Sequence, residues 1–327
     1  MCHRCKGKKR KNMKILITGG QGFIGAAIAN VLQTEHSITI MDNWSENYPG
    51  YAAIHRGKDG LKQASELEIK HRKQASIYRE ELIKEIPIVK GWSWQKELET
   101  IDEPDLIINC GSLSEAILSQ YLEDFTWLSI VKGIENIKKT FKCPVLHFSS
   151  SMSYGSWEGA IKEDGEQNPV DWYGSCKKDS EAFIDQNDII VRPMHVYGFG
   201  DGKFPMPMNI ERQYQNGRPV TVEEADCIYI KDLTVAIKKI VDKWIPGVYN
   251  LSSGYLRSKD VIKEEAKNIL GFEIETINKS GPTGKNRGTL DSSKLAQVYN
   301  WNSQYKNYKE TIIDYFNEYR IRNENNS

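Results

Sequence analysis

The sequence has no long apolar segment, no excess of either charge and no cysteine spacing typical of a disulfide framework. No apolar run approaches the ~18–20 residues of a membrane-spanning helix, and the N-terminal segment has no signal-peptide core. With 44 basic and 44 acidic residues, the chain has no net field that favours nucleic acid or a membrane surface as a partner. We therefore expect a globular protein in a reducing, cytoplasmic environment.

The first twelve residues hold an isolated Cys-x-x-Cys pair, Cys2 and Cys5, followed by a run of basic residues. A zinc site needs four ligands at a workable spacing, and no second Cys/His pair follows. The sequence therefore predicts a disordered basic tail over residues 1–12, no metal site, and a domain that begins near Met13.

A short apolar strand that begins at Lys14 runs directly into a glycine-rich turn and then into an apolar helix. Gly20, Gly22 and Gly25 match the G-x-G-x-x-G pattern, and Gly19 adds a related spacing of one glycine every third residue. Glycine permits a tight turn, close approach of the backbone to a pyrophosphate, and close packing of helix on strand. The helix would then direct its free N–H groups at the phosphates, so the pattern predicts a dinucleotide site.

The next apolar strand ends in a residue with a carboxylate side chain. Asp42 lies 17 residues after Gly25, at the end of the run HSITIMD. A carboxylate at this point can accept hydrogen bonds from the adenosine ribose hydroxyls, and it would repel a 2′-phosphate. The sequence therefore favours NAD over NADP as the cofactor.

Strand and helix patterns alternate through the first half of the chain. Residues 86–91, 105–111 and 144–150 have the apolar composition of buried parallel strands. This alternation predicts a parallel sheet with right-handed crossovers. The segment 44–85 is unusually long for a connection and is charged and helical in pattern. We interpret it as a solvated helical insertion, with a lid or an oligomer contact as the functional alternative.

A candidate catalytic group follows the strand at 144–150. That strand ends in consecutive serines, and Tyr173 and Lys177 come next with the spacing that places two side chains on one helix face. A tyrosine has a pKa of about 10, so acting as a base near neutrality requires lowering it by roughly 3 units, or about 4 kcal/mol. The Lys177 ammonium and a positively charged nicotinamide both favour the phenolate. A serine hydroxyl would hold the substrate oxygen.

Together these motifs resemble the extended short-chain dehydrogenase/reductases, specifically the NAD-dependent epimerase/dehydratase family that acts on nucleotide sugars. The resemblance extends from Lys14 to about Arg320. It implies an α/β fold, with a Rossmann-like doubly wound parallel sheet in residues 13–190. It also implies a smaller C-terminal α/β substrate lobe in residues 191–327, with segments that return to the sheet. The expected partners are a nucleotide sugar or related small molecule and a second copy of the chain.

The resemblance assigns Ser150, Tyr173 and Lys177 as the catalytic residues. Those it assigns to the NAD site are Gly19, Gly22, Phe23, Ile24, Gly25, Asp42, Asn43, Cys110, Gly111, Ser112, Ser149, Tyr173, Lys177, Pro193 and Val196. Those it assigns to the substrate are Ser151, His195, Lys203, Phe204 and Arg287.

Several positions depart from the family pattern. Trp92 follows the third strand where the family has an aspartate that contacts adenine, and Ile130 stands in place of a helix asparagine. His195 replaces an asparagine that contacts the sugar. Ala225 replaces an arginine that pairs with the substrate diphosphate, and Lys285 and Arg287 are the candidates to supply that charge.

We expect an NAD-dependent nucleotide-sugar epimerase that forms a transient ketosugar. The acid/base pair that dehydratases carry after the catalytic serine is replaced here by Ser151 and Met152, which makes a 4,6-dehydratase the less favoured outcome. The alternatives are an NAD-dependent dehydrogenase/reductase, or a dehydratase, of a sugar or other small carbonyl or alcohol. A non-catalytic Rossmann binding protein is the remaining one, and the complete Ser150, Tyr173 and Lys177 set argues against it.

Overall fold

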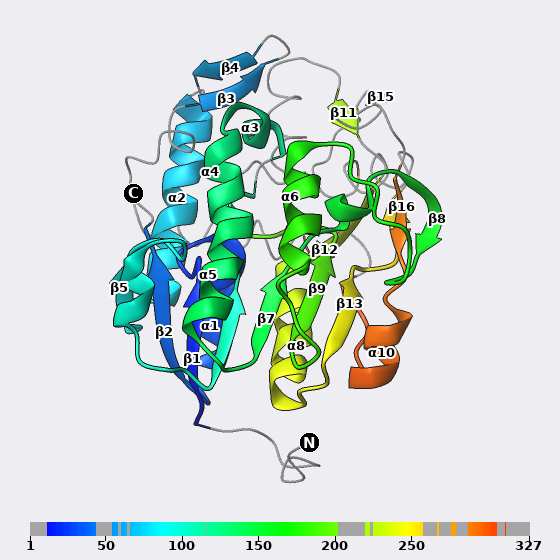
Figure 1. Cartoon of the computed structure of the whole chain (residues 1–327). Coiled ribbons are helices and arrows are strands. Elements are labelled where there is room, and N and C mark those ends of the chain that lie inside the picture. Colours follow the sequence, from blue (N-terminus) through cyan, green and yellow to red (C-terminus); the bar gives the residue numbers. More distant parts are fainter. Residues whose placement is uncertain are drawn as a thin grey trace.

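The computed structural model in Figure 1 gives the fold of the chain. The predicted tail with Cys2 and Cys5 lies outside the described residues, as do Lys203 and Phe204. The residues described are 12–43, 54–57, 60–63, 66–114, 116–201, 220–222, 225–257, 267, 276–278, 287–305 and 311.

A sheet of seven parallel strands forms the centre of the molecule. Several of its strands are buried along their full length, as their near-continuous apolar sequences require for a sheet covered on both faces. In spatial order the strands are β13 (Gly247–Leu251), β9 (Ile189–Pro193), β7 (Val145–Phe148), β6 (Leu106–Asn109), β1 (Lys14–Thr18), β2 (Ser37–Asp42) and β5 (Ile88–Lys90). The reversal of order beside β1 confirms the predicted Rossmann-like doubly wound fold.

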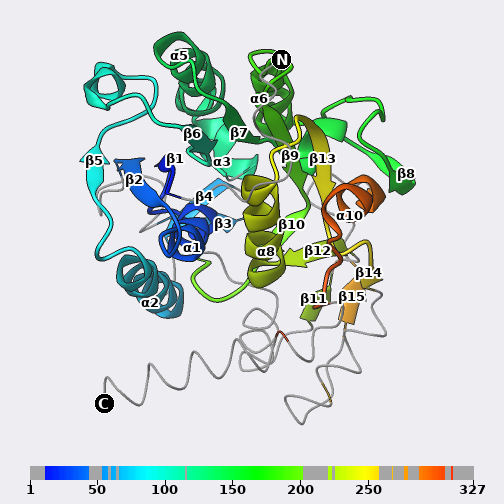
Figure 2. The ribbon, with the colours of Figure 1, turned by 90° about the horizontal axis from the view of Figure 1, so that it is seen from below.

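Helices cover both faces of this sheet, as Figure 2 shows from below. Side chains alternate along β1: Ile15 and Ile17 enter the core cluster under α1 and α8, whereas Leu16 enters a second cluster with Ile134 and Ile137 of α5. On one face lie α1 (Phe23–Leu32), α2 (Glu66–Leu82) and α8 (Ile230–Asp242). On the other lie α3 (Ala116–Tyr121), α4 (Glu123–Trp127), a π-helical turn (Leu128–Lys132), α5 (Gly133–Thr140) and α6 (Trp172–Glu181).

The long connection after β2 differs from the expected solvated excursion. Its described part contains an antiparallel hairpin of β3 (Ile54–Gly57) and β4 (Gly60–Gln63), followed by α2. Helix α2 packs beside α1, and its Ala75 and Arg79 are 1% and 4% exposed. One face of α2 is therefore part of the protein interior, although its other face carries exposed polar residues.

Smaller sheets lie beyond the carboxyl end of the main sheet, and a short 3-10 helix (Lys96–Thr100) follows β5. Segments from the C-terminal half also return to the central layer, because β13 extends the sheet and α8 packs on α1. The assignment of residues 191–327 to a substrate lobe stays a prediction. The smaller sheets consist of β10 (His195–Tyr197), β12 (Ala225–Tyr229) and β14 (Leu256–Arg257); β16 (Arg287–Leu290) and β8 (Trp157–Ile161); and β11 (Val220–Val222) and β15 (Thr276–Asn278). Helix α10 (Ser293–Tyr299) packs against β13.

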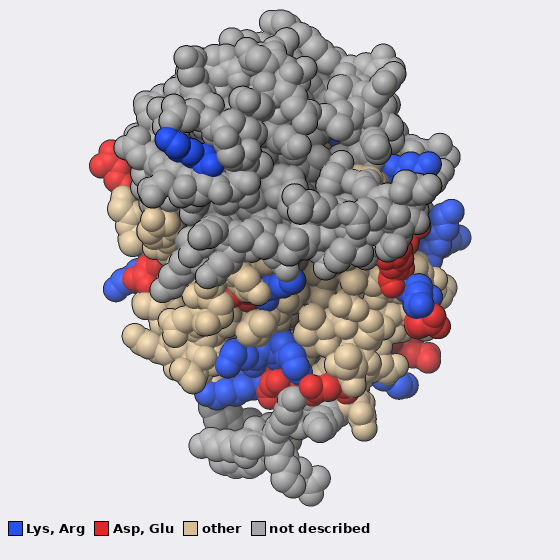
Figure 3. Space-filling view, turned by 180° about the vertical axis from the view of Figure 1, so that it is seen from behind, with Lys and Arg blue, Asp and Glu red and all other residues tan. Residues whose placement is uncertain are grey.

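The surface carries charges of both signs. On the described part of the face seen in Figure 3, basic and acidic side chains lie next to one another. Lys238 of α8, for example, pairs with Glu35 at 2.9 Å and with Asp242 at 3.5 Å. Among the described residues, no helix combines the length and apolar character needed to span a membrane.

Candidate active site

The turn between β1 and α1 has no room for a side chain at Gly19 or Gly25. Gly19 has a φ of +69°, and a Cβ there would lie 2.6 Å from the Cα of Gly111. A Cβ on Gly25 would lie 2.3 Å from the Gly19 carbonyl oxygen. Gly22 is the N-cap of α1, so the free N–H groups of the first turn, which includes Phe23, can bind an anion. The turn therefore has the geometry of a pyrophosphate site.

Asp42 lies against this turn. Its side chain is 8% exposed, and its Oδ2 accepts a hydrogen bond of 2.9 Å from the backbone N–H of Gln21. The carboxylate is thus fixed beside the pyrophosphate-binding backbone, where the ribose of a dinucleotide would lie. Asn43, which follows, is partly buried. The structure therefore places Asp42 next to the glycine turn.

The loop after β6 contacts both β1, which precedes the glycine turn, and Lys177 of α6. The N–H of Cys110 donates to the Thr18 carbonyl at 3.1 Å, and Ser112 Oγ accepts from Lys177 Nζ at 3.2 Å. Burial raises the pKa of the Cys110 thiol well above its usual range, so this thiol is neutral. Residues 110–112 therefore lie next to both β1 and α6.

Tyr173 and Lys177 share one face of α6. Lys177 Nζ lies 5.8 Å from the centroid of the Tyr173 ring. Its side chain is buried, and Nζ donates to the carbonyl of Phe148 at 2.7 Å. Asp171 is the N-cap of α6, and its carboxylate accepts a hydrogen bond of 2.7 Å from the N–H of Gly174. The cap and the Phe148 contact fix the rotation of α6, so that Lys177 faces the end of β7.

Ser150 lies at that end of β7. It is the N-cap of a short 3-10 helix (Ser151–Tyr154), and its Oγ accepts from the N–H of Met152 at 3.2 Å. The first turn of α6 packs closely here, because a Cβ on Gly174 would lie 2.5 Å from the Met152 carbonyl oxygen. The structure therefore brings the Ser150 turn and the start of α6, where Tyr173 lies, into contact.

Burial lowers the pKa of Lys177 from an ordinary 10.5 to about 8. In the folded state the lysine therefore loses its proton near pH 8, whereas the unfolded chain keeps it up to about pH 10.5. Between these values the unfolded state binds more protons, so the stability of the protein rises with pH. Below pH 8 the buried ammonium costs about 3 kcal/mol of stability.

This shift gives a pH-dependent prediction for Lys177→Met in the protein without cofactor. The free energy of unfolding of the variant, minus that of the wild type, should fall by about 2–3 kcal/mol between pH 7 and pH 10. Urea unfolding at several pH values measures this difference. A difference that stays constant with pH would show that Lys177 keeps an ordinary pKa in the folded state.

A chain of buried hydrogen bonds leads from β1 across the sheet to α6. Thr18 Oγ1 donates to Asn109 Oδ1 at 2.6 Å, so the Asn109 amide donates to His147 Nδ1 at 3.0 Å. His147 Nε2 then donates to Ser180 Oγ at 2.9 Å, and Ser180 donates to the Lys177 carbonyl at 2.7 Å. Burial holds the pKa of His147 well below its usual value, which keeps the ring neutral in this tautomer. The chain positions α6 relative to the glycine turn.

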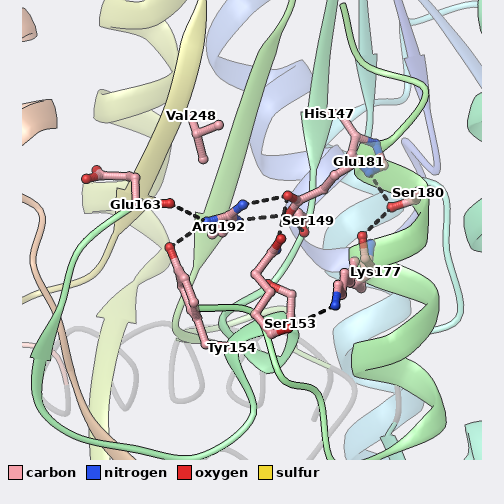
Figure 4. Close-up of polar contacts among 12 residues, drawn as sticks. His147, Ser149, Ser153, Tyr154, Glu163, Lys177, Ser180, Glu181, Arg192 and Val248 are labelled. Atoms are coloured by element: carbon pink, nitrogen blue, oxygen red, sulfur yellow. Dashed lines mark hydrogen bonds and ion pairs between the residues drawn. The ribbon is translucent and has the colours of Figure 1, made fainter. Parts of the chain in front are cut away.

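A second buried network of hydrogen bonds holds Ser149, at the end of β7 (Figure 4). Arg192 of β9 donates from Nε and Nη2 to the two carboxylate oxygens of Glu181, at 2.9 and 2.6 Å. Glu181 Oε1 also accepts from Ser149 Oγ at 2.5 Å, and Arg192 Nη1 donates to Tyr154 Oη at 2.7 Å. Sequence reasoning missed Glu181. The available signals were its position four residues after Lys177 and the presence of an arginine within an apolar strand.

Aromatic side chains occupy the corner beside Asp42 where the family pattern has an aspartate. The N–H of Gly91 donates to the Asp42 carbonyl at 3.1 Å, which places the loop after β5 next to the ribose position. Trp92 stacks on Trp94 with ring centroids 4.7 Å apart, and Phe125 packs edge-on against both. This corner is therefore lined with aromatic rings.

The structure describes only some of the residues that the sequence predicts to bind the substrate. Ser151 is buried in the 3-10 helix, and His195 is exposed on β10, paired with Cys227 of β12. Arg287 begins β16, but its side chain lies outside the described part of the chain. The remaining cofactor candidates lie on the same elements as the site: Ile24 in the first turn of α1, Ser149 after β7, Pro193 at the end of β9 and Val196 in β10.

The sequence matches a known protein family, and the fold is similar to those of solved structures. The model of the NAD-dependent epimerase/dehydratase family matches residues 15–252. A search of curated protein sequences gave no match. The fold is similar to UDP-glucuronic acid 4-epimerase from Bacillus cereus in complex with UDP-glucuronic acid and NAD, at 19% identity and a TM-score of 0.74, covering 94% of this chain and 99% of that one.

Two further solved structures share the fold. UDP-N-acetylglucosamine 4-epimerase from Methanobrevibacter ruminantium M1 is 19% identical with a TM-score of 0.74, covering 96% of this chain and 100% of that one. The dTDP-glucose 4,6-dehydratase of Bacillus anthracis is 18% identical with a TM-score of 0.70, covering 94% and 97%. The glycine turn with its adjacent carboxylate fits a bound NAD. With the family match across most of the chain, these observations establish that the protein belongs to the NAD-dependent epimerase/dehydratase family of enzymes.

Proposed function

We propose that the protein is a nucleotide-sugar epimerase that uses a retained NAD. The observation that carries the proposal is the burial of Lys177 against the end of β7, on the helix that also carries Tyr173 and packs against the Ser150 turn. Ser150 Oγ would hold the oxygen of a sugar hydroxyl, and Tyr173 would take its proton. The Lys177 ammonium favours the phenolate form of Tyr173. A bound NAD would supply reversible hydride transfer at the sugar carbon.

The residues after the serine favour epimerisation over dehydration. Elimination of water from the ketosugar needs an acid and a base close to the substrate. Ser151 and Met152 occupy the two positions after Ser150, and neither side chain titrates near neutral pH. The structures of similar fold include UDP-sugar 4-epimerases, so we propose UDP-sugars as the first substrates to test.

A dehydrogenase or reductase of a smaller substrate is the second candidate. Ala225 begins β12 where the family pattern has the arginine that binds the substrate diphosphate, which favours a substrate without that group. The two functions differ in their use of cofactor. An epimerase turns over without net change of NAD, whereas a reductase consumes added NADH in proportion to product.

The first experiment is mass spectrometry of ligands released from the purified protein, followed by thermal-shift measurements with UDP-, GDP-, CDP- and dTDP-sugars. We expect NAD in near-equimolar amount and a raised unfolding temperature with at least one nucleotide sugar. Protein that neither carries NAD nor responds to any of these nucleotide sugars would contradict the epimerase proposal. The cytoplasmic location stays a prediction.

We also propose a homodimer packed through α4 and α6. Exposed apolar side chains lie on or next to these helices in the sequence: Tyr121 is 54% exposed, Trp127 39% and Val170 37%. Exposed apolar side chains suit a two-fold interface, in which the same surface of each copy is buried. We expect twice the chain mass of 37.4 kDa by light scattering. Trp127→Glu should give monomers, whereas Val235→Glu, a 49% exposed control on α8, should stay dimeric. Monomeric wild-type protein would contradict this proposal.

A further inference from the structure

Helix α2 contributes one buried cation to the edge of the dinucleotide site. The Arg79 side chain is 4% exposed, although most of its neighbours on the helix are polar. Its Nε donates to the carbonyl of Gln21 at 3.0 Å, and its Nη1 donates to the carbonyl of Gly200 at 2.6 Å. One guanidinium therefore joins two loops that are distant in the sequence.

Both loops lie at the turn that would bind the cofactor. Gln21 belongs to the glycine turn, and its N–H is the group that holds Asp42 at 2.9 Å. Gly200 belongs to residues 198–201, which follow β10 and have positive φ at Gly198 and Gly200. A Cβ on Gly200 would lie 3.7 Å from the ring of Phe23, the first residue of α1. Residues 198–201 therefore pass over the start of α1, where the pyrophosphate would be bound.

The residue before Arg79 holds the same segment. Tyr78 packs edge-on against Phe199, with ring centroids 4.8 Å apart. A Cβ on Gly200 would lie 2.9 Å from the Tyr78 ring, so the tyrosine and the backbone of Gly200 are in close contact. Two consecutive residues of α2 thus hold residues 199–200, one by packing and one by a hydrogen bond.

We propose that Tyr78 and Arg79 form a clasp that holds residues 198–201 over the glycine turn and slows the release of NAD. The inference rests on the proposed epimerase function, because an enzyme that returns the hydride to its substrate benefits from keeping its cofactor through the cycle. It gives α2 a role in retaining the cofactor. Arginine suits this position because its planar fork can donate to two carbonyls at once, which a lysine ammonium does less rigidly.

The test compares the dissociation rate of the cofactor in variants of α2. Protein is loaded with NADH, excess NAD⁺ is added, and the change in NADH fluorescence gives the rate. Loss of charge-assisted hydrogen bonds should raise the rate about tenfold or more in Arg79→Met. Arg79→Lys should fall between that variant and the wild type. Lys73→Met, which removes an exposed cation from the same helix, should match the wild type.

The unfolding temperature of the cofactor-free protein separates retention from simple destabilisation. A lower unfolding temperature in Arg79→Met together with a wild-type NADH dissociation rate would overturn the clasp. If Arg79→Met does not fold, Tyr78→Leu carries the test, because it loosens residues 199–200 without removing the buried charge. An unchanged rate in Tyr78→Leu would then overturn the proposal. Failure of the epimerase proposal appears separately, as wild-type protein that retains NAD but converts no UDP-sugar.

Discussion

Replacing Tyr173 by phenylalanine should lower turnover by about 10²–10⁴-fold while leaving NAD bound, because only the proton-accepting hydroxyl is lost. The ring would keep its packing against the Ile130 and Cys176 cluster, so the fold should be preserved. Lys177 would also keep its bonds to Phe148 and Ser112, since neither involves the tyrosine hydroxyl. Turnover of a UDP-sugar identified by the thermal-shift screen, with NAD content measured on the same samples, gives the result.

Tyr121→Phe serves as the matched control. It removes the same hydroxyl from a tyrosine that is 54% exposed at the end of α3, so its turnover should equal that of the wild type. Wild-type turnover in Tyr173→Phe would show that another group takes the substrate proton. Loss of NAD from Tyr173→Phe would show that the residue serves the cofactor site instead.

Replacing Arg192 by methionine should destabilise the protein by about 3–5 kcal/mol, the usual cost of breaking a buried ion pair from one side. The arginine and glutamate side chains are 5% and 9% exposed, so the remaining Glu181 carboxylate would stay buried without its cation. The variant also loses the hydrogen bonds from Nη1 to Tyr154 and to the Glu163 carbonyl. Urea unfolding monitored by circular dichroism measures the change.

A surface pair provides the comparison for Arg192. Lys139 pairs with Glu135 on α5, and the Lys139 side chain is 64% exposed. Lys139→Met should therefore cost under about 1 kcal/mol. The double variant Arg192→Met/Glu181→Leu should recover part of the lost stability, because it removes the isolated charge. Equal effects of Arg192→Met and Lys139→Met would contradict the account of a buried network that supports the serines.

The sequence was sufficient for the core of the fold because local patterns determined it. The apolar runs of β5, β6 and β7 fall within the predicted ranges 86–91, 105–111 and 144–150, and each is shorter than predicted. Strands β6 and β7 are buried as predicted, and buried parallel strands are apolar throughout, so their presence is visible without knowledge of their neighbours. The prediction of burial was wrong for β5, which is an edge strand with Ile88 44% exposed. Their ends depend on hydrogen bonds to adjacent strands, which no local pattern reveals.

The buried contacts of helix α2 could not be predicted from the sequence. Its residues are mostly polar, so the pattern predicts a solvated helix, and Arg79 looks like one more surface cation. Its two carbonyl partners are 58 and 121 residues away in the chain. Only the folded topology shows that the glycine turn and residues 198–201 converge on the same side of α2.

The shared helix face of Tyr173 and Lys177 was predictable because their spacing is local, whereas the contacts that support it were not. Tyr173 and Lys177 are separated by one helical turn, which the sequence displays directly. Glu181 is one turn further along, but its role depends on its ion pair with Arg192 of β9. The sequence flagged Trp92 as a departure, but its stacking with Trp94 and Phe125 required the structure.

The most direct test of the central claim is turnover without added cofactor. Purified protein is incubated with UDP-glucuronic acid, UDP-N-acetylglucosamine or UDP-glucose, with products identified by NMR and NADH followed at 340 nm. We predict that at least one of these sugars is converted to an epimer, with no added NAD and no steady accumulation of NADH. Formation of NADH in proportion to product, a dehydrated sugar product, or no conversion of any of the three would contradict the account.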